Sequence, residues 1–230
     1  MIRAIVLDIE GTTSPTDAVR EDLYGYTERR LPGWLAENAT DTAESVLTET
    51  RELAGEPGAD TDRVAEILTG WLRSDVKAAP LKAAQGAICA QGFRAGELFG
   101  RFFADVAPAL AAWRESGLPL YVYSSGSERN QRDWFAHAES GDLSGLISGH
   151  FDLVTAGPKR EAASYALIAE RIGIPPAEIL FLSDHPDELD AAAEAGWQVI
   201  GVHRPDEPNL PRPPHRWVGS FDEIEVGADT

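Results

Sequence analysis

Short runs of apolar residues recur along the chain and predict buried β-strands, because each run has the length of a strand and is rich in Val, Ile and Leu. The runs span residues 3–7, 119–123, 151–154, 179–183 and 198–202. Apolar residues at helical spacing predict helices between the later runs, over 128–137, 161–172 and 188–195. Strands that alternate with helices in this way predict an α/β fold, built on a mostly parallel sheet covered by helices on both faces.

The interval between the first two strands departs from this alternation, because about 110 residues separate them and a crossover between parallel strands needs only about a dozen. Helical spacing of apolar residues continues through much of this interval and is interrupted at 55–60 and near Pro80. We therefore expect a helical domain inserted at 16–103 and a core domain formed by 1–15 and 104–230. An insertion directly after the first strand would cover the carboxyl end of that strand, so we expect it to act as a lid.

The amino-acid composition excludes some kinds of binding partner and some kinds of site for this chain. The chain has 20 basic and 38 acidic residues, a formal charge of −18, which disfavours nucleic acid and anionic membranes because both reward clustered Lys and Arg. Cys89 is the only cysteine, so an intrachain disulfide is excluded and we expect a buried apolar residue. No run of about eighteen apolar residues occurs, and the first residues lack the pattern of a basic stretch followed by a long apolar one, so we expect a cytoplasmic protein. The proline-rich segment 204–216 is interpreted as an irregular surface loop rather than a polyproline ligand.

Polar residues follow each predicted strand, at the edge of the sheet where α/β proteins bind ligands. Asp8 and Glu10 follow the first strand. If strand geometry continues there, their carboxylates point the same way and need a cation, a shared proton or an open loop; an exposed turn is the alternative. Ser124 and Ser125 follow the second strand, where a helix is expected to begin. Their hydroxyl and N–H groups suit a phosphate, and a serine that merely caps the helix is the alternative.

Lys159 and Asp184 follow the third and fourth predicted strands. Lys159 lies at the expected start of a helix, where a cation is disfavoured unless an anion lies close, and a solvated lysine is the alternative. Acidic residues without basic neighbours surround Asp184, and oxygen ligands of this kind suit magnesium rather than zinc. Asp187 and Asp190 are interpreted as parts of an acidic first helical turn, and His185 as a loop residue.

These strand ends resemble the haloacid-dehalogenase superfamily of aspartyl-phosphate-forming hydrolases. The resemblance rests on the stretches 8–13 (DIEGTT), 123–127 (YSSGS), 157–159 (GPK) and 181–184 (FLSD). Most magnesium-dependent phosphatases of the superfamily carry Asp-x-Asp after the first strand, whereas Glu10 in the second place is similar to the enolase-phosphatases of methionine salvage. The resemblance implies a Rossmann-like parallel sheet as the core, with a helical cap domain inserted after the first strand.

The resemblance also implies roles for the residues at the strand ends. Asp8 would be the nucleophile that forms an aspartyl-phosphate, and Glu10 would be the general acid and base. One Mg²⁺ per subunit would be held by the carboxylates of Asp8 and Asp184 and by the backbone carbonyl of Glu10. The phosphoryl group would be held by Ser124, Ser125 and Lys159. Glu188, four residues after Asp184, would orient either Lys159 or a water bound to the metal.

The resemblance implies that the substrate is a small phosphorylated metabolite, 2,3-diketo-5-methylthiopentyl-1-phosphate. It would be enolised and then dephosphorylated to 1,2-dihydroxy-3-keto-5-methylthiopentene, the acireductone of methionine salvage. The base for the enolisation stays unassigned. In the cap, Lys82 and Gln85 are candidates for substrate contact, and Asp75 agrees with the family pattern. We expect a monomer.

Three other functions remain open. A generic magnesium-dependent phosphatase of the same superfamily, acting on another small metabolite such as phosphoglycolate, would share the residues of the core. A dehalogenase would not need Mg²⁺, so activity that resists a chelator would indicate it. A signalling receiver also combines Asp, Ser or Thr and Lys around Mg²⁺, but its acceptor normally follows a middle strand, without an inserted lid.

Overall fold

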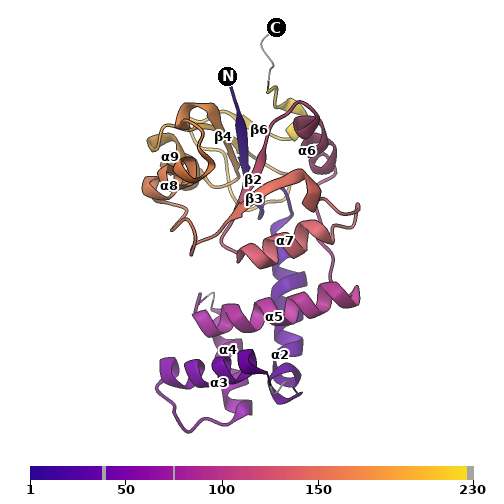
Figure 1. Cartoon of the computed structure of the whole chain (residues 1–230), viewed down its shortest axis with the longest axis vertical. Coiled ribbons are helices and arrows are strands. Elements are labelled where there is room, and N and C mark those ends of the chain that lie inside the picture. Colours follow the sequence, from indigo (N-terminus) through magenta and orange to yellow (C-terminus); the bar gives the residue numbers. More distant parts are fainter. Residues whose placement is uncertain (38–39, 75, 227–230) are drawn as a thin grey trace. The chain divides into compact units, whose positions relative to one another are not determined.

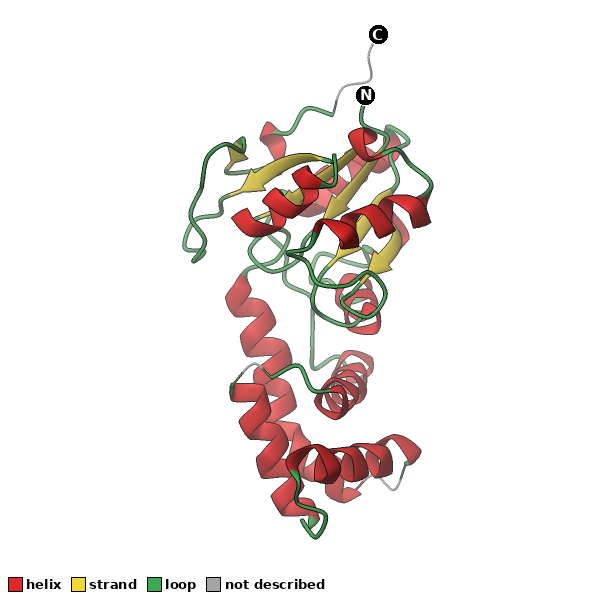
Figure 2. Cartoon of the chain, turned by 90° about the vertical axis from the view of Figure 1, so that its left-hand side faces the viewer, coloured by secondary structure: helices red, strands yellow, loops and turns green. Residues whose placement is uncertain are grey.

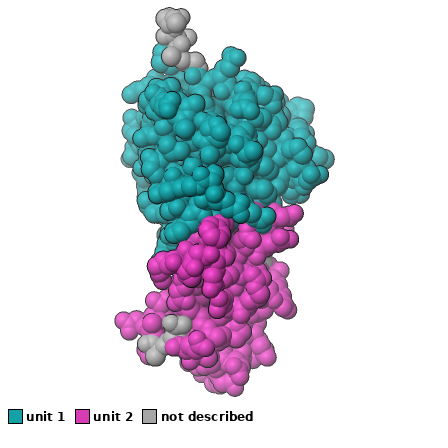
Figure 3. All heavy atoms as spheres, turned by 90° about the vertical axis from the view of Figure 1, so that its right-hand side faces the viewer, with its two compact units in different colours: residues 1–16, 100–230 teal, residues 17–99 magenta. Residues whose placement is uncertain are grey.

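The computed structural model describes residues 1–37, 40–74 and 76–226. Contacts between residues divide the chain into two compact units (Figure 3). Unit 1 comprises Met1–Thr16 and Gly100–Thr230, and unit 2 comprises Asp17–Phe99. The boundaries expected from the sequence, before residue 16 and after residue 103, lie one and four residues from these.

The described part of unit 1 is built on a parallel six-stranded sheet with the order β3-β2-β1-β4-β5-β6 (Figures 1 and 2). The chain adds strands on one side of β1 and then on the other, so the carboxyl ends of β1, β2 and β4 meet where the strand order reverses, the usual ligand position in such sheets. The α/β prediction is confirmed. The strands are β1 (Ala4–Leu7), β2 (Leu120–Tyr123), β3 (Ile147–Phe151), β4 (Ile179–Ser183), β5 (Gln198–Val202) and β6 (Trp217–Val218).

Helices cover both faces of the sheet, with α8 and α9 on one side and α6 on the other (Figure 1). The expected helices agree with the observed ones to within two residues at each end. The elements are α6 (Val106–Glu115), α7 (Glu128–Ala136), α8 (Ala162–Ile172) and α9 (Pro186–Glu194), with short 3₁₀ turns at Ser144–Leu146, Pro176–Glu178 and Phe221–Glu223.

An aromatic cluster fixes β2 and β4 against α8. The ring of Tyr165 on α8 packs edge-on against Tyr123, Phe181 and Trp197 at centroid distances of 5.5, 5.3 and 5.3 Å. All four side chains are buried, and such pairs contribute about 0.5–1.5 kcal/mol each beyond the burial of their area. The cluster therefore holds the ends of β2 and β4, which carry candidate site residues, in a rigid core.

The third strand is the main error of the sequence interpretation. The structure places it at Ile147–Phe151 and not at 151–154, because the Asp152 side chain accepts hydrogen bonds from the N–H groups of Val154 and Thr155 and turns the chain there. Val154 is 84% exposed, so its apolar side chain does not mark a buried strand, although the hydropathy pattern predicted one there. The short strand β6 was also missed, since two residues carry no periodicity.

Unit 2 is helical in its described residues, with a core that includes Leu31, Trp34, Leu68 and Ile88. Cys89 is fully buried, which confirms the prediction of a buried apolar residue. The breaks expected at 55–60 and near Pro80 are both present, since α4 ends at Arg73 and α5 begins at Ala79 with Pro80 in its first turn. The elements are α1 (Thr16–Ala18), a π-helical turn at Val19–Tyr24, α2 (Gly25–Glu37), α3 (Asp41–Ala54), α4 (Thr61–Arg73) and α5 (Ala79–Ala95). Within the described residues, no helix has both the length and the apolar character needed to span a bilayer.

Candidate active site

Three candidate residues stand at neighbouring strand ends of unit 1. Leu7 of β1 is paired in register with Val122 of β2 and with Leu182 of β4, and the next N–H group, that of Asp8, donates to the carbonyl of Leu182 over 2.9 Å. Asp8 therefore emerges between the ends of β2 and β4, beside Ser124 and Asp184. The parallel pairing of β1 with both neighbours is what brings these distant parts of the sequence together.

The loop after β1 is a tight turn and not a continued strand. The N–H groups of Thr12, Thr13 and Ser14 all donate to the carbonyl of Ile9, at 3.2, 3.0 and 2.9 Å. The condition under which strand alternation would align Asp8 with Glu10 is therefore not met, because regular strand geometry ends at Leu7.

The same turn supports Asp184. The Thr12 hydroxyl accepts a hydrogen bond from the N–H of Asp184 over 2.8 Å. Gly11 has φ +71°, and a Cβ placed on it would lie 2.2 Å from the Asp184 carboxylate. The Asp184 carboxylate therefore lies directly against the Gly11 backbone, an approach that leaves no room for a side chain.

Lys159 forms a buried ion triad with two carboxylates. Its Nζ lies 2.6 Å from Oδ1 of Asp8 and 2.6 Å from Oε2 of Glu188. The Ser183 hydroxyl donates to the same Glu188 carboxylate over 2.9 Å. Burial alone would lower the pKa of Lys159, but the charges of Asp8 and Glu188 outweigh it and raise that pKa above its ordinary value. Lys159 is therefore a buried cation that both carboxylates hold in place.

The position of Lys159 differs from the expected one. It lies in the loop before α8, which begins only at Ala162, so the argument from the first turn of a helix does not apply. Two hydroxyls hold this loop: Tyr165 donates to the carbonyl of Lys159 and Tyr123 donates to that of Gly157, both over 2.7 Å. The charge of Lys159 is compensated by Asp8 and Glu188, and the solvated-lysine alternative is wrong.

Negative charge exceeds positive charge in this group. Burial, reinforced by the nearby charge of Asp8, raises the pKa of Asp184 to about 7. Burial, reinforced by Asp8, also raises the pKa of Glu188 to about 7, although Lys159 opposes the shift. Three buried carboxylates thus lie around a single buried lysine in this part of the described chain, an arrangement that an additional cation would stabilise.

The donor chemistry fits magnesium. Among the residues that the structure describes, no group of three or more His, Cys, Asp or Glu side chains forms a metal-binding cluster. The expected ligand set has only two carboxylates, those of Asp8 and Asp184, with the backbone carbonyl of Glu10 as a third donor. Mg²⁺ commonly binds through one or two carboxylates and retains several waters, so this sparse, oxygen-only set is adequate for it.

The loop after β2 offers free hydrogen-bond donors. Among the described residues, the hydroxyls of Ser124 and Ser125 and the N–H of Ser125 have no protein partner. Ser127 is the residue that caps α7, since its side chain accepts from the N–H of Asn130 over 3.3 Å. The capping alternative thus applies to Ser127 and leaves Ser124 and Ser125 available to a ligand.

The other acidic residues of α9 lie outside this group. Asp190 is exposed and Asp187 partly exposed, and both pair with Arg212, in agreement with an acidic helical turn at the surface. The His185 ring caps α9 by accepting from the N–H of Asp187. In the described structure, no hydrogen bond or ion pair joins the side chains of these three residues to Asp8 or Lys159.

Three supporting residues were not found from the sequence. Thr12 and Ser183 could have been noticed, because each adjoins a candidate residue in a motif. Asn209 had no such signal: its side-chain amide donates to Oδ2 of Asp184 over 2.7 Å from the proline-rich segment. That segment is the irregular and largely exposed loop that the sequence predicted. Its first residue, Arg204, is nevertheless buried and donates to the carbonyl of Thr12.

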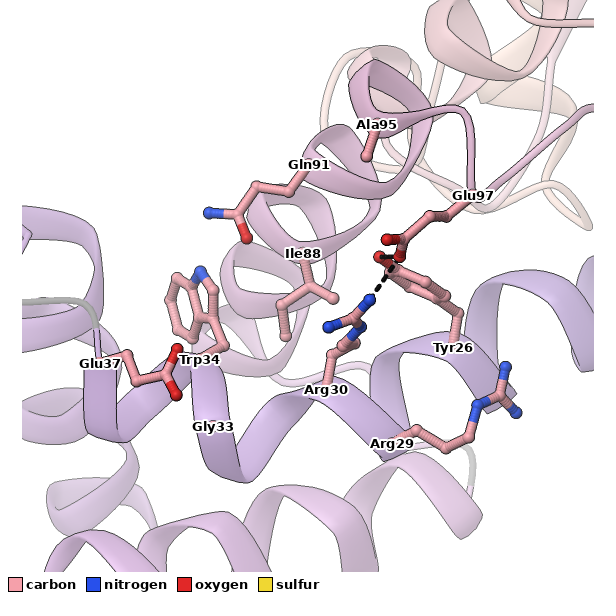
Figure 4. Close-up of a pocket in the computed structure, with 10 residues that line it drawn as sticks. All are labelled: Tyr26, Arg29, Arg30, Gly33, Trp34, Glu37, Ile88, Gln91, Ala95 and Glu97. Atoms are coloured by element: carbon pink, nitrogen blue, oxygen red, sulfur yellow. Dashed lines mark hydrogen bonds and ion pairs between the residues drawn. The ribbon is translucent and has the colours of Figure 1, made fainter.

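The candidate cap residues lie in unit 2. Lys82 and Gln85 are half-buried and lie three positions apart on α5, and Asp75 falls outside the described residues. Unit 2 also contains a pocket of about 360 Å³ between α2 and α5 (Figure 4), where the Tyr26 hydroxyl and the Arg30 guanidinium both bind the Glu97 carboxylate. Lys82 and Gln85 do not line this pocket.

Comparison with known proteins defines the class. Residues 2–196 match the family model of the haloacid dehalogenase-like hydrolases. The chain therefore belongs to the haloacid dehalogenase-like hydrolase family. Among solved structures, it is similar to the L-2-haloacid dehalogenase of Xanthobacter autotrophicus, with a TM-score of 0.56 and 20% identity over 96% of each chain, a likeness of fold alone.

More specific relatives lie within that family. The chain is 68% identical to an enolase-phosphatase E1 of Nocardia farcinica, over 98% of this chain and 97% of the relative. It is 50% identical to an enolase-phosphatase E1 of Pseudomonas aeruginosa, over 98% and 99% of the two chains. It also superimposes on the UTR4 protein of Saccharomyces cerevisiae with a TM-score of 0.83 and 29% identity, over 97% and 100% of the chains. The resemblance to the enolase-phosphatases is confirmed.

Proposed function

We propose that this chain is an enolase-phosphatase of methionine salvage, which converts 2,3-diketo-5-methylthiopentyl-1-phosphate to 1,2-dihydroxy-3-keto-5-methylthiopentene and phosphate. The phosphatase activity is supported mainly by the buried triad of Asp8, Lys159 and Glu188, which lies beside Asp184. The enolase part is supported by the relatives named enolase-phosphatase E1, which match the chain almost from end to end.

Asp8 is the proposed nucleophile. Its carboxylate oxygen forms a bond to phosphorus while the bond from phosphorus to the substrate oxygen breaks, and Glu10 gives that oxygen a proton. A water molecule then attacks the aspartyl-phosphate, with Glu10 taking its proton, and releases phosphate and free Asp8. A Mg²⁺ ion bound to Asp8, Asp184 and the carbonyl of Glu10 would offset the repulsion between the nucleophile and the phosphate.

Lys159, Ser124 and Ser125 are the proposed phosphoryl ligands. The ammonium group of Lys159 already lies 2.6 Å from the nucleophile, so it can contact a phosphoryl oxygen during transfer without a large movement. Glu188 keeps Lys159 in this place and keeps it charged. Charges fixed in a buried site stabilise a transition state better than mobile ones, because they need no reorganisation when the reaction occurs.

Unit 2 is the proposed cap that selects the substrate, with Lys82 and Gln85 as candidate contacts. In this proposal, the protein is a cytoplasmic monomer. It acts on a small phosphorylated metabolite and binds neither nucleic acid nor membrane. The base that removes the proton for enolisation has no assigned residue.

The function is tested by giving the purified chain the diketo phosphate with Mg²⁺ and, separately, with EDTA. Enediol absorbance and released phosphate are followed together. We expect both signals with Mg²⁺ and neither with EDTA. Release of phosphate without an enediol signal would indicate a generic phosphatase, and activity that persists in EDTA would contradict the magnesium assignment.

A further inference from the structure

The loop that carries Ser124 and Ser125 is held by the buried side chain of Gln131 on α7. The amide nitrogen Nε2 of Gln131 lies 2.8 Å from the carbonyl oxygen of Gly126, 2.9 Å from that of Phe151 and 3.4 Å from that of Ser124. Gln131 is 2% exposed. Carbonyl oxygens only accept hydrogen bonds, so the NH₂ group, and not the amide oxygen, must face the loop.

These contacts fix the direction of the loop's own N–H groups. A peptide unit is planar and trans, so the carbonyl of one residue and the N–H of the next point in opposite directions. When the carbonyls of Ser124 and Gly126 point at Gln131, the N–H groups of Ser125 and Ser127 point away from it. Within the described residues, neither N–H group has a hydrogen-bond partner. Gln131 thus keeps two unpaired donors on the side of the loop opposite α7.

The helix itself does not supply these donors. At the N-terminus of α7, the N–H of Glu128 donates to the Asp152 carboxylate over 3.1 Å and the N–H of Asn130 donates to the Ser127 hydroxyl over 3.3 Å. The first turn of α7 is therefore partly satisfied by protein groups. An anion at this junction would therefore rely on N–H groups of the loop and not on the end of the helix alone.

His150 prevents the Gln131 amide from turning over. The Nδ1 atom of His150 lies 3.3 Å from Oε1 of Gln131, and an amide oxygen only accepts, so Nδ1 carries the hydrogen. Burial lowers the pKa of His150 to about 4, which keeps the ring neutral. The ring of Phe135 packs against His150 at a centroid distance of 6.2 Å. A flipped amide would place its oxygen against three carbonyl oxygens, so this arrangement has one favourable orientation.

We propose that Gln131, oriented by His150, is a positioning residue for phosphoryl transfer: it holds the 124–127 loop so that the N–H groups of Ser125 and Ser127 bind the phosphoryl oxygens. The inference rests on the proposed function and deepens it. Gln131 itself contacts no substrate atom, because its amide is occupied by the backbone of the loop.

The test replaces Gln131 by methionine, which has a similar length but no amide. Its matched control is Gln198→Met, because the Nε2 of Gln198 also donates to a backbone carbonyl, that of Ala177, over 2.8 Å, at the opposite end of the sheet. Inhibition by orthophosphate, kcat/KM for the diketo phosphate and Mg²⁺ affinity by calorimetry are measured for both variants and for the wild type.

We expect Gln131→Met to weaken orthophosphate binding by about tenfold or more and to lower kcat/KM by about 10- to 100-fold, since two oriented hydrogen bonds are lost. Mg²⁺ affinity should stay within about twofold, because the proposed ligands stand on the loops after β1 and β4. Gln198→Met should match the wild type in all three measurements. A merely structural role would lower thermal stability without this selective loss of phosphate affinity.

The proposal is overturned if folded Gln131→Met binds orthophosphate as tightly as the wild type. If that variant does not fold, His150→Phe is used instead, because it retains the Gln131 amide but removes the hydrogen bond that orients it. Phosphate binding by His150→Phe should weaken by about threefold. Unchanged binding would again contradict the proposal. Failure of the proposed function is a separate result, in which the wild type itself produces neither enediol nor phosphate while the comparison of orthophosphate binding still stands.

Discussion

Gly11→Ala is expected to disable the site through one added methyl group. Gly11 has φ +71°, and an added Cβ would lie 2.2 Å from Oδ2 and 2.6 Å from Cγ of Asp184. The Asp184 carboxylate is also bound by the Asn209 amide over 2.7 Å. The new methyl group must therefore push a carboxylate that is already held from another direction.

Two effects of different size are expected. The left-handed backbone costs a residue with a Cβ about 1–2 kcal/mol. The steric effect is local: ordinary contact begins at 3.4 Å, so the carboxylate must move by about 1.2 Å, the difference from 2.2 Å. A displacement of about 1 Å at a reacting centre costs about 100-fold in rate. We therefore expect kcat/KM to fall by about two orders of magnitude and Mg²⁺ affinity to fall as well.

Gly173→Ala separates the two effects. Gly173 has φ +69° and caps α8, and no atom lies within 4 Å of an added Cβ. Urea unfolding should show a similar loss of stability for both variants, whereas calorimetric titration with Mg²⁺ and kcat/KM should show a defect only for Gly11→Ala. If Gly11→Ala binds Mg²⁺ and turns over like Gly173→Ala, the close approach of Asp184 to Gly11 is not functionally important and the reasoning is refuted.

Three further outcomes are expected. Asp8→Asn should abolish phosphate release while circular dichroism stays unchanged, and turnover above about 1% of the wild type would exclude Asp8 as nucleophile. Asn209→Ala should weaken Mg²⁺ binding by about tenfold in calorimetry, because it releases the Asp184 carboxylate; an unchanged affinity would show that Asp184 needs no such support. Burial lowers the pKa of His150 to about 4 from 6.5, so the unfolded chain takes up a proton first as the pH falls from 6.5 towards 4. Urea unfolding should therefore show the wild type losing about 2 kcal/mol more than His150→Phe between pH 7 and pH 5, and equal losses would contradict a buried neutral ring.

The strands that the sequence predicted best are those buried on both faces. Every residue of β1 and β4 is buried, so their apolar runs are uninterrupted and their ends could be recognised. The third strand, Ile147–Phe151, contains Ser, Gly and His and was placed too late, because the following residues are more apolar although they form a turn. Local hydropathy does not reveal whether a side chain such as Val154 has anything to pack against.

The sequence alone determined the order of the elements and the residues that follow each strand, because hydrophobic periodicity and the types of polar residue are local properties. Tertiary structure decided which of these residues act together. Lys159 meets Asp8 across 151 positions of the sequence, and Asn209 reaches Asp184 from a proline-rich loop whose sequence indicates no role at the site. Such contacts depend on which strands pair and where the loops turn, and these are properties of the folded chain rather than of any short stretch of it.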